Sequence, residues 1–140
     1  MKDLQVIIDL SGSMCEMGKP SVVANVLSTV SGDGPLSKMQ WDGSDKTLEP
    51  LLEKCSGKNT LLLTDGYALS DNCSTNRNIR NALESENLFV VLCGADALNV
   101  SALRDFSRVK TITADNVLFA LERFQNTPDN QKAEETGDEW

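Results

Sequence analysis

Continuous apolar runs alternate along the chain with stretches in which apolar residues recur every three or four positions. Short continuous runs are typical of strands that are buried on both faces of a parallel sheet. Three such runs are predicted as strands, at Leu4–Leu10, Thr60–Thr64 and Leu88–Cys93. Two weaker strands are predicted at Met39–Trp41, where apolar and polar residues alternate, and at Val109–Thr113.

The segments between these strands have the periodicity of amphipathic helices. Helices are predicted at Pro20–Ser31, from Thr47 to Ser56, at Thr75–Ser85, around Val100–Phe106, and after an N-cap at Asp115. The polar stretch Tyr67–Thr75 is predicted to be a loop. Alternating strands and helices predict an α/β fold of three layers, a doubly wound and mostly parallel sheet flanked by helices.

The length of 140 residues suits one domain. We assign residues 1–126 to this domain and expect the acidic segment 127–140 to be a disordered tail. The net charge of −8 argues against nucleic acid and anionic membrane surfaces as partners. No apolar run approaches the roughly 18 residues of a membrane-spanning helix. The first apolar run is broken by Gln5 and ended by Asp9, unlike a signal peptide, so a cytoplasmic protein is expected.

The chain contains no histidine, which excludes Ser-His-Asp and Cys-His catalysis. Its four cysteines show no CxxC spacing, and we expect them to be free and mostly buried. A disulfide between Cys15 and Cys73 is the alternative.

A candidate site follows the first strand. Asp9, Ser11 and Ser13 place one carboxylate and two hydroxyls at alternate positions, and Gly12 allows a tight turn between them. Ligands of α/β sheets bind outside the carboxyl ends of the strands. Hard oxygen atoms of this kind suit Mg²⁺.

Asp9-x-Ser11-x-Ser13 at the end of a first strand resembles the metal-ion-dependent adhesion site (MIDAS) of von Willebrand factor A (vWA) domains. Members of that family add a Thr just before a helix and an Asp at the end of the central strand. Thr47 and Asp65 stand in these places, although Thr47 could instead be a simple N-cap, and Ser44 is the rival hydroxyl. The resemblance implies a Rossmann-like vWA fold that binds Mg²⁺ or Mn²⁺. The metal ligands that it implies are Asp9, Ser11, Ser13, Thr47 and Asp65.

The resemblance also implies a compact member of prokaryotic or phage type. The stretch before Gly43 has room for one short strand, so the antiparallel edge hairpin of many vWA domains is expected to be shortened. The function implied is a protein–protein interaction module, not an enzyme, in which a partner's Asp or Glu binds the metal. Small vWA proteins of bacteria and phages are often partners of MoxR-type AAA+ ATPases.

Two alternatives remain open. The first is a metal-dependent phosphotransferase or phosphatase that forms an aspartyl phosphate on Asp9. Such enzymes of the haloacid dehalogenase type carry a second acid where this chain has Ser11, and a lysine that we do not expect beside the strand ends here. The second alternative is a metal-free structural domain.

Overall fold

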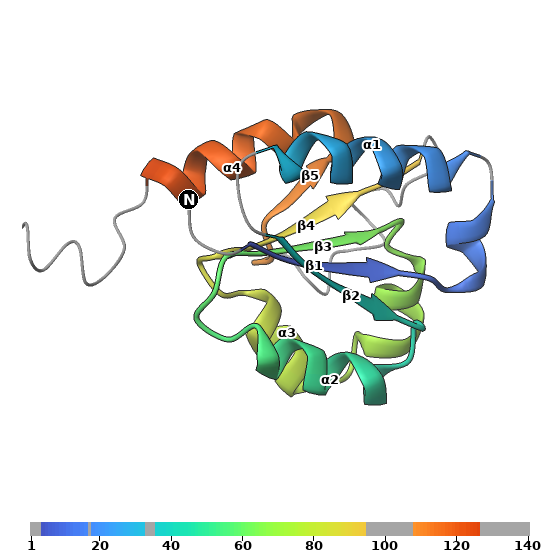
Figure 1. The fold of residues 1–140 in the computed structure, drawn as a ribbon. Coiled ribbons are helices and arrows are strands. Elements are labelled where there is room, and N and C mark those ends of the chain that lie inside the picture. The colour runs from blue at the N-terminus through green and yellow to red at the C-terminus, as the bar shows by residue number, and fades with distance from the viewer. Residues whose placement is uncertain (1–3, 17, 33–35, 95–107, 127–140) are drawn as a thin grey trace, which may run out of the picture.

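A five-stranded parallel sheet forms the centre of the molecule in this computed structural model, which describes residues 4–16, 18–32, 36–94 and 108–126 (Figure 1). The strands lie in the order β2-β1-β3-β4-β5. Their bounds are Leu4–Asp9 (β1), Leu36–Trp41 (β2), Thr60–Thr64 (β3), Leu88–Leu92 (β4) and Thr111–Thr113 (β5). This is the predicted α/β class, and all five predicted strands are present.

Burial follows the position of each strand in the sheet. Every residue of the central strand β3 is buried, as its continuous apolar sequence predicts. The edge strand β2 alternates between more and less exposed residues, and it pairs with β1 from Leu4 opposite Leu36 to Asp9 opposite Trp41. All pairs in the described part of the sheet are parallel, so β2 stands there as a single edge strand, as the short connection predicted.

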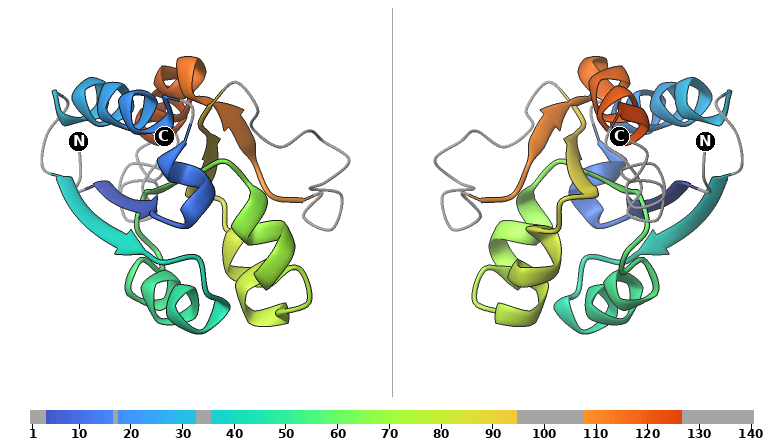
Figure 2. Two further views of the ribbon diagram at one scale, coloured as in Figure 1. Left: turned by 90° about the vertical axis from the view of Figure 1, so that its right-hand side faces the viewer. Right: turned by 90° about the vertical axis from the view of Figure 1, so that its left-hand side faces the viewer.

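Helices cover both faces of the sheet and complete the three layers (Figures 1 and 2). Helices α1 (Lys19–Ser31) and α4 (Val117–Asn126) lie on one face. Helices α2 (Asp45–Lys54) and α3 (Arg77–Leu83) lie on the other. Short helical turns occur at Gly12–Cys15 (η1), Leu69–Cys73 (η2, a π-helical turn) and Ala114–Asn116 (η4).

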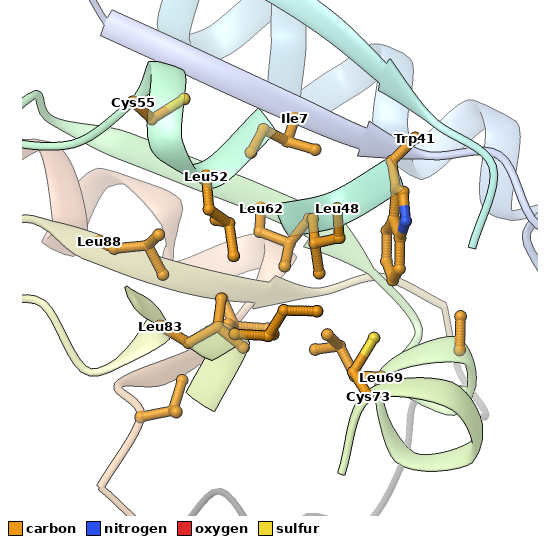
Figure 3. Close-up of a cluster of buried hydrophobic side chains, with 14 residues drawn as sticks. Ile7, Trp41, Leu48, Leu52, Cys55, Leu62, Leu69, Cys73, Leu83 and Leu88 are labelled. Carbon is orange, nitrogen blue, oxygen red and sulfur yellow. The ribbon is translucent and has the colours of Figure 1, made fainter. Parts of the chain in front are cut away.

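Each face of the sheet packs a separate hydrophobic core, because successive side chains of a strand point to opposite faces. Ile7 and Leu62 face α2 and α3, together with Trp41 from β2 (Figure 3). Their sequence neighbours Val6 and Leu61 belong to the core beneath α1 and α4.

Three local predictions are wrong. The predicted loop Tyr67–Thr75 contains η2, because Ala68, Leu69 and Cys73 pack into the core below α2 and α3. Helix α2 begins at Asp45, before Thr47. Asp115 lies within η4 and does not cap α4 from outside.

Some predictions fall on residues that the structure does not describe. The helix expected around Val100–Phe106 and the acidic tail 127–140 both lie outside the described residues. Within the described residues, no helix combines the length and the apolar character that crossing a membrane requires.

Candidate functional site

The direction in which the strands are added to the sheet reverses between β1 and β3. On its outer side β1 pairs with β2, whereas β3 pairs with β4 on the opposite side. In doubly wound sheets, ligands bind outside the carboxyl ends of the strands at such a reversal. Asp9 ends β1, and Asp65 directly follows β3. Both carboxylates therefore lie at the position where this class of sheet binds its ligands.

Asp9 is fully buried and forms hydrogen bonds to the loop after β1 and to the last residue of β3. Its Oδ1 atom accepts a hydrogen bond from the backbone N–H of Ser11 at 2.8 Å. Its Oδ2 atom accepts one from the Thr64 hydroxyl at 2.6 Å, and Thr64 Oγ1 accepts the Gly66 N–H at 3.0 Å. The carboxylate thus joins the ends of β1 and β3. A carboxylate offers about four lone-pair positions, so each oxygen of Asp9 keeps capacity for a further donor or cation.

Asp65 has a different environment, because it forms an ion pair with a lysine. Its Oδ2 atom lies 3.0 Å from Lys19 Nζ, and both side chains are fully buried. Its Oδ1 atom accepts the Tyr67 N–H at 3.1 Å. Lys19 Nζ also donates to the Ser13 carbonyl at 3.1 Å. The expectation that no lysine lies beside the strand ends is therefore wrong.

Lys19 reaches this position through the loop after β1. The turn η1 follows β1, and Gly18, with a positive φ of 75°, is the N-cap of α1. The first residue of α1, Lys19, therefore lies at the strand ends. The methylene groups of Lys19 lie against Gly94, which follows β4. A Cβ atom on Gly94 would be 2.8 Å from Lys19 Cγ and Cε. The available sequence signal was a lysine at the predicted helix start, and periodicity alone does not show which acid it would meet.

Ser11 carries the unsatisfied polar atom of the site. Its Oγ atom is buried and has no hydrogen-bond partner in the described part of the chain, which costs about 1–3 kcal/mol unless a ligand satisfies it. Gly43 covers this serine, since a Cβ on Gly43 would be 2.9 Å from Ser11 Cβ. Ser13 is half-buried, and its carbonyl accepts from Lys19.

Thr47 is exposed in the first turn of α2, and its hydroxyl forms hydrogen bonds to the residues just before this helix. Its hydroxyl lies 2.6 Å from Asp42 Oδ1 and 3.0 Å from the Ser44 carbonyl. The N-cap of α2 is Ser44, whose Oγ accepts the Lys46 N–H at 3.1 Å, so the N-cap alternative for Thr47 is wrong.

Asp42 is a third carboxylate at this edge, which the sequence analysis did not select. It directly follows β2, and the hydrogen bond from Thr47, followed by that from the Ser44 backbone, lowers the pKa of its carboxyl. A position just after a strand was the signal that could have identified it.

The loops after β1, β2 and β3 converge on one another. Gly43 lies against both Ser11 and Ala68, and its carbonyl accepts a hydrogen bond from Asn72 Nδ2 at 2.7 Å. Figure 2, left, looks onto this end of the sheet. The structure therefore brings four of the predicted site residues to the ends of β1 and β3 and places Thr47 in the first turn of α2. The four are Asp9, Ser11, Ser13 and Asp65.

The oxygen atoms at this edge are of the kind that hard cations such as Mg²⁺ prefer. Among the described residues, no three His, Cys, Asp or Glu side chains cluster as a metal-ligand set, so hydroxyl oxygens would have to contribute. Asp9 and the Ser11 hydroxyl have free acceptor capacity for Mg²⁺ or Mn²⁺. Asp65, by contrast, already has a positively charged partner in Lys19.

The cysteines offer no alternative chemistry. All four are free, with Cys15 exposed and the other three buried, so the Cys15–Cys73 disulfide does not form. Burial raises the pKa of the Cys73 and Cys93 thiols to about 12. These two thiols are therefore protonated at neutral pH and are poor nucleophiles.

No protein-family model matches this sequence, and no curated protein matches it. The class that the structure defines is a Rossmann-like α/β fold with five parallel strands flanked by helices.

Proposed function

We propose that this chain is a vWA-type interaction module that binds Mg²⁺ or Mn²⁺ at the carboxyl end of β1 and thereby binds an Asp or Glu of a partner protein. The observation that carries the proposal is the buried Ser11 hydroxyl, which has no hydrogen-bond partner among the described residues. The backbone N–H of the same serine donates to Asp9. A buried polar atom without a protein partner is rare in folded proteins, and a bound ion or water molecule is a common reason for one.

We propose that the cation is bound by Asp9, Ser11 and Ser13, together with Thr47 from the first turn of α2. The ends of β1 and β3 fix Asp9, and Gly43 packs on Ser11, so much of the site is preformed. A bound divalent cation would leave positive charge for an incoming carboxylate. The net charge of −8 favours this dependence, because an acidic partner would be repelled without the cation.

Exposed apolar side chains beside the site support a protein as the partner. Leu10, next to Asp9, is 48% exposed, and Tyr67, two residues after Asp65, is 37% exposed. Large apolar groups around a polar centre are typical of protein-binding surfaces. The partner is thus proposed to offer an acidic side chain next to an apolar one, and a MoxR-type AAA+ ATPase is the candidate that the vWA resemblance suggests.

The enzyme alternative is not favoured by the newly found lysine. Lys19 is fully buried, and its ammonium contacts Asp65 and the Ser13 carbonyl, so it presents no exposed positive charge to a phosphate. We therefore propose no catalytic residue. Phosphate release from generic phosphoesters that disappears in Asp9→Asn would contradict this proposal in favour of the phosphotransferase.

The proposal is tested by thermal unfolding with and without Mg²⁺. A ligand at a hundred times its Kd adds about 2.7 kcal/mol to the free energy of unfolding. We expect this Mg²⁺-dependent rise in Tm to disappear in Asp9→Ala and to shrink in Ser11→Ala. Glu53→Gln, which removes one exposed negative charge in the last turn of α2, is the control and should retain the full rise.

Partner binding is tested by a pull-down from native lysate in Mg²⁺ and in EDTA. The proposal requires a captured protein that is lost both in EDTA and in Asp9→Ala. A wild-type chain whose Tm does not respond to Mg²⁺ or Mn²⁺ would instead support the metal-free structural domain.

A further inference from the structure

Lys19 is a fully buried ammonium group at the candidate cation site. A buried charge needs a counter-charge, because its unpaired form is strongly disfavoured in the protein interior. Asp65 supplies this counter-charge at 3.0 Å, and the Ser13 carbonyl accepts from the same ammonium at 3.1 Å. The other oxygen of Asp65 accepts the Tyr67 N–H. Each oxygen of Asp65 thus accepts one hydrogen bond, as in Asp9, but the donor to Oδ2 is a charged ammonium group, which competes with a cation for this carboxylate.

The surrounding backbone keeps Lys19 in place. Its methylene groups lie against Gly94 with no room for a Cβ between them. Its own backbone begins α1, between the left-handed Gly18 and Pro20, whose ring presets the helical φ angle. Lys19 Nζ also lies 5.7 Å from the centre of the Tyr67 ring. These contacts hold the ammonium beside Asp65 from several sides.

From these contacts we infer that Lys19 withholds Asp65 from the bound cation and sets the affinity of the site, so that Asp9 and the hydroxyls bind the cation without Asp65. The inference rests on the proposed function, since it takes a cation at Asp9. It differs from the five ligands predicted from the sequence, because Asp65 pairs with Lys19 and is not a ligand of the cation.

The positive charge of Lys19 affects how tightly the site binds a cation and what the bound cation can attract. Asp9 and Asp65 are the two fully buried carboxylates described at this edge, and Lys19 neutralises one of them. A divalent cation then binds less tightly than it would between two free carboxylates. Once bound, it keeps a net positive charge that a partner's carboxylate can meet. Lys19 thus lowers cation affinity and raises the affinity of the loaded site for an acidic partner.

The test is a calorimetric titration of the full chain with Mn²⁺. Lys19→Met replaces the ammonium by an apolar side chain of similar length and frees Asp65. We expect Mn²⁺ to bind at least tenfold more tightly to this variant than to the wild type. Without Mn²⁺ the variant should melt at a lower temperature, because Asp65 is then buried and unpaired, and Mn²⁺ should restore more of its Tm than it adds to the wild type.

A second variant separates the ligand role of Asp65 from its charge. Lys19→Met/Asp65→Asn removes both charges of the ion pair, so the net charge of the site equals that of the wild type and no charge is left unpaired. We expect its Mn²⁺ affinity to lie within threefold of the wild type. An affinity at least tenfold weaker would mean that Asp65 is a ligand in the wild type, and the inference would be overturned.

Lys46→Met is the matched control, because Lys46 is exposed in the first turn of α2, the helix that follows β2. It changes the net charge of the chain by the same amount as Lys19→Met but frees no buried carboxylate, so Mn²⁺ affinity should change less than threefold. Equal tightening in both lysine variants would reduce the effect to long-range charge and overturn the inference.

The remaining outcomes are also decisive. If Lys19→Met does not fold, as judged by far-UV circular dichroism, the double variant decides the question by itself. Lys19→Met that folds but binds Mn²⁺ no more tightly than the wild type overturns the inference. A wild type that binds Mn²⁺ but captures no partner contradicts the proposed function while the affinity comparison still decides the role of Lys19. If the wild type and both variants bind no Mn²⁺, the result contradicts both the proposed function and the role inferred for Lys19.

Discussion

At the scale of single residues, the candidate site depends on close approaches that leave no space for a side chain. Gly94 has a φ of +105°, and Lys19 occupies the space where its Cβ would be. Gly43 has a φ of +98° and lies in the same way against Ser11. Both positions require glycine for two separate reasons, backbone conformation and packing. The ion pair between Lys19 and Asp65 can form because Gly94 leaves room for the lysine.

Gly94→Ala should therefore destabilise the fold by about 2–4 kcal/mol, from the strained positive φ together with the displacement of Lys19. Gly57→Ala is the matched control: its φ is +77°, and no atom lies within 4 Å of the added Cβ. This control should lose about 1 kcal/mol, from conformation alone. Urea unfolding measures both variants. Equal losses would show that the contact with Lys19 adds nothing to the requirement for glycine at position 94.

At the scale of elements, the starts of α1 and α2 determine which polar groups reach the site. Gly18 is the N-cap of α1, so the helix begins at Lys19, which forms the ion pair with Asp65. The N-cap of α2 is Ser44, whose hydroxyl accepts the Lys46 N–H and whose carbonyl accepts the indole N–H of Trp41 at 2.8 Å. Ser44 therefore connects the helix start to the buried end of β2, and it places Thr47 in the first turn beside Asp42.

Ser44→Ala removes the cap of α2 and should lower the free energy of unfolding by about 1 kcal/mol. Ser44→Gly is the matched variant, because glycine is tolerated at an N-cap and should lose only a few tenths of a kcal/mol. Chemical unfolding followed by far-UV circular dichroism measures the difference. If Ser44→Ala keeps the stability of the wild type, the side-chain hydrogen bond to Lys46 contributes nothing to stability.

At the scale of the whole molecule, one sheet supports two hydrophobic cores. Neighbouring residues on β3 serve opposite cores, with Leu62 facing α2 and α3 (Figure 3) and Leu61 facing α1 and α4. Both leucines are fully buried. Both cores are built on the same strands, so loss of either core would also destabilise the strands that support the other. The two cores should therefore unfold together.

Leu61→Ala and Leu62→Ala should each cost about 2–5 kcal/mol and shift one common transition. Trp41, which is buried in the core of α2 and α3, provides a fluorescence probe when Trp140→Phe removes the second tryptophan. Trp41 fluorescence and far-UV circular dichroism should give coincident unfolding curves for both variants. A separate fluorescence transition in Leu62→Ala would show that the two cores unfold independently.

The sequence by itself determined the class of fold. The apolar runs of β1, β3 and β4 and the helical spacing in α1, α2 and α4 are properties of neighbouring residues, and each was sufficient to predict its element. Asp9 and Asp65 could be expected at one edge, because the carboxyl ends of parallel strands meet there. The candidate metal ligands followed from their residue types and spacing, and their role remains a prediction.

Only the tertiary structure decided which polar groups meet. The pairing of Lys19 with Asp65 joins residues that are 46 positions apart, and it depends on the turn η1 and on the space above Gly94. The helical turn η2 formed within a polar stretch because the core buried Leu69 and Cys73. Periodicity reports which face of an element is apolar, but the partner of a buried charge is chosen by packing among distant segments. For that reason the fold could be read from local pattern, whereas the counter-ion of Asp65 could not.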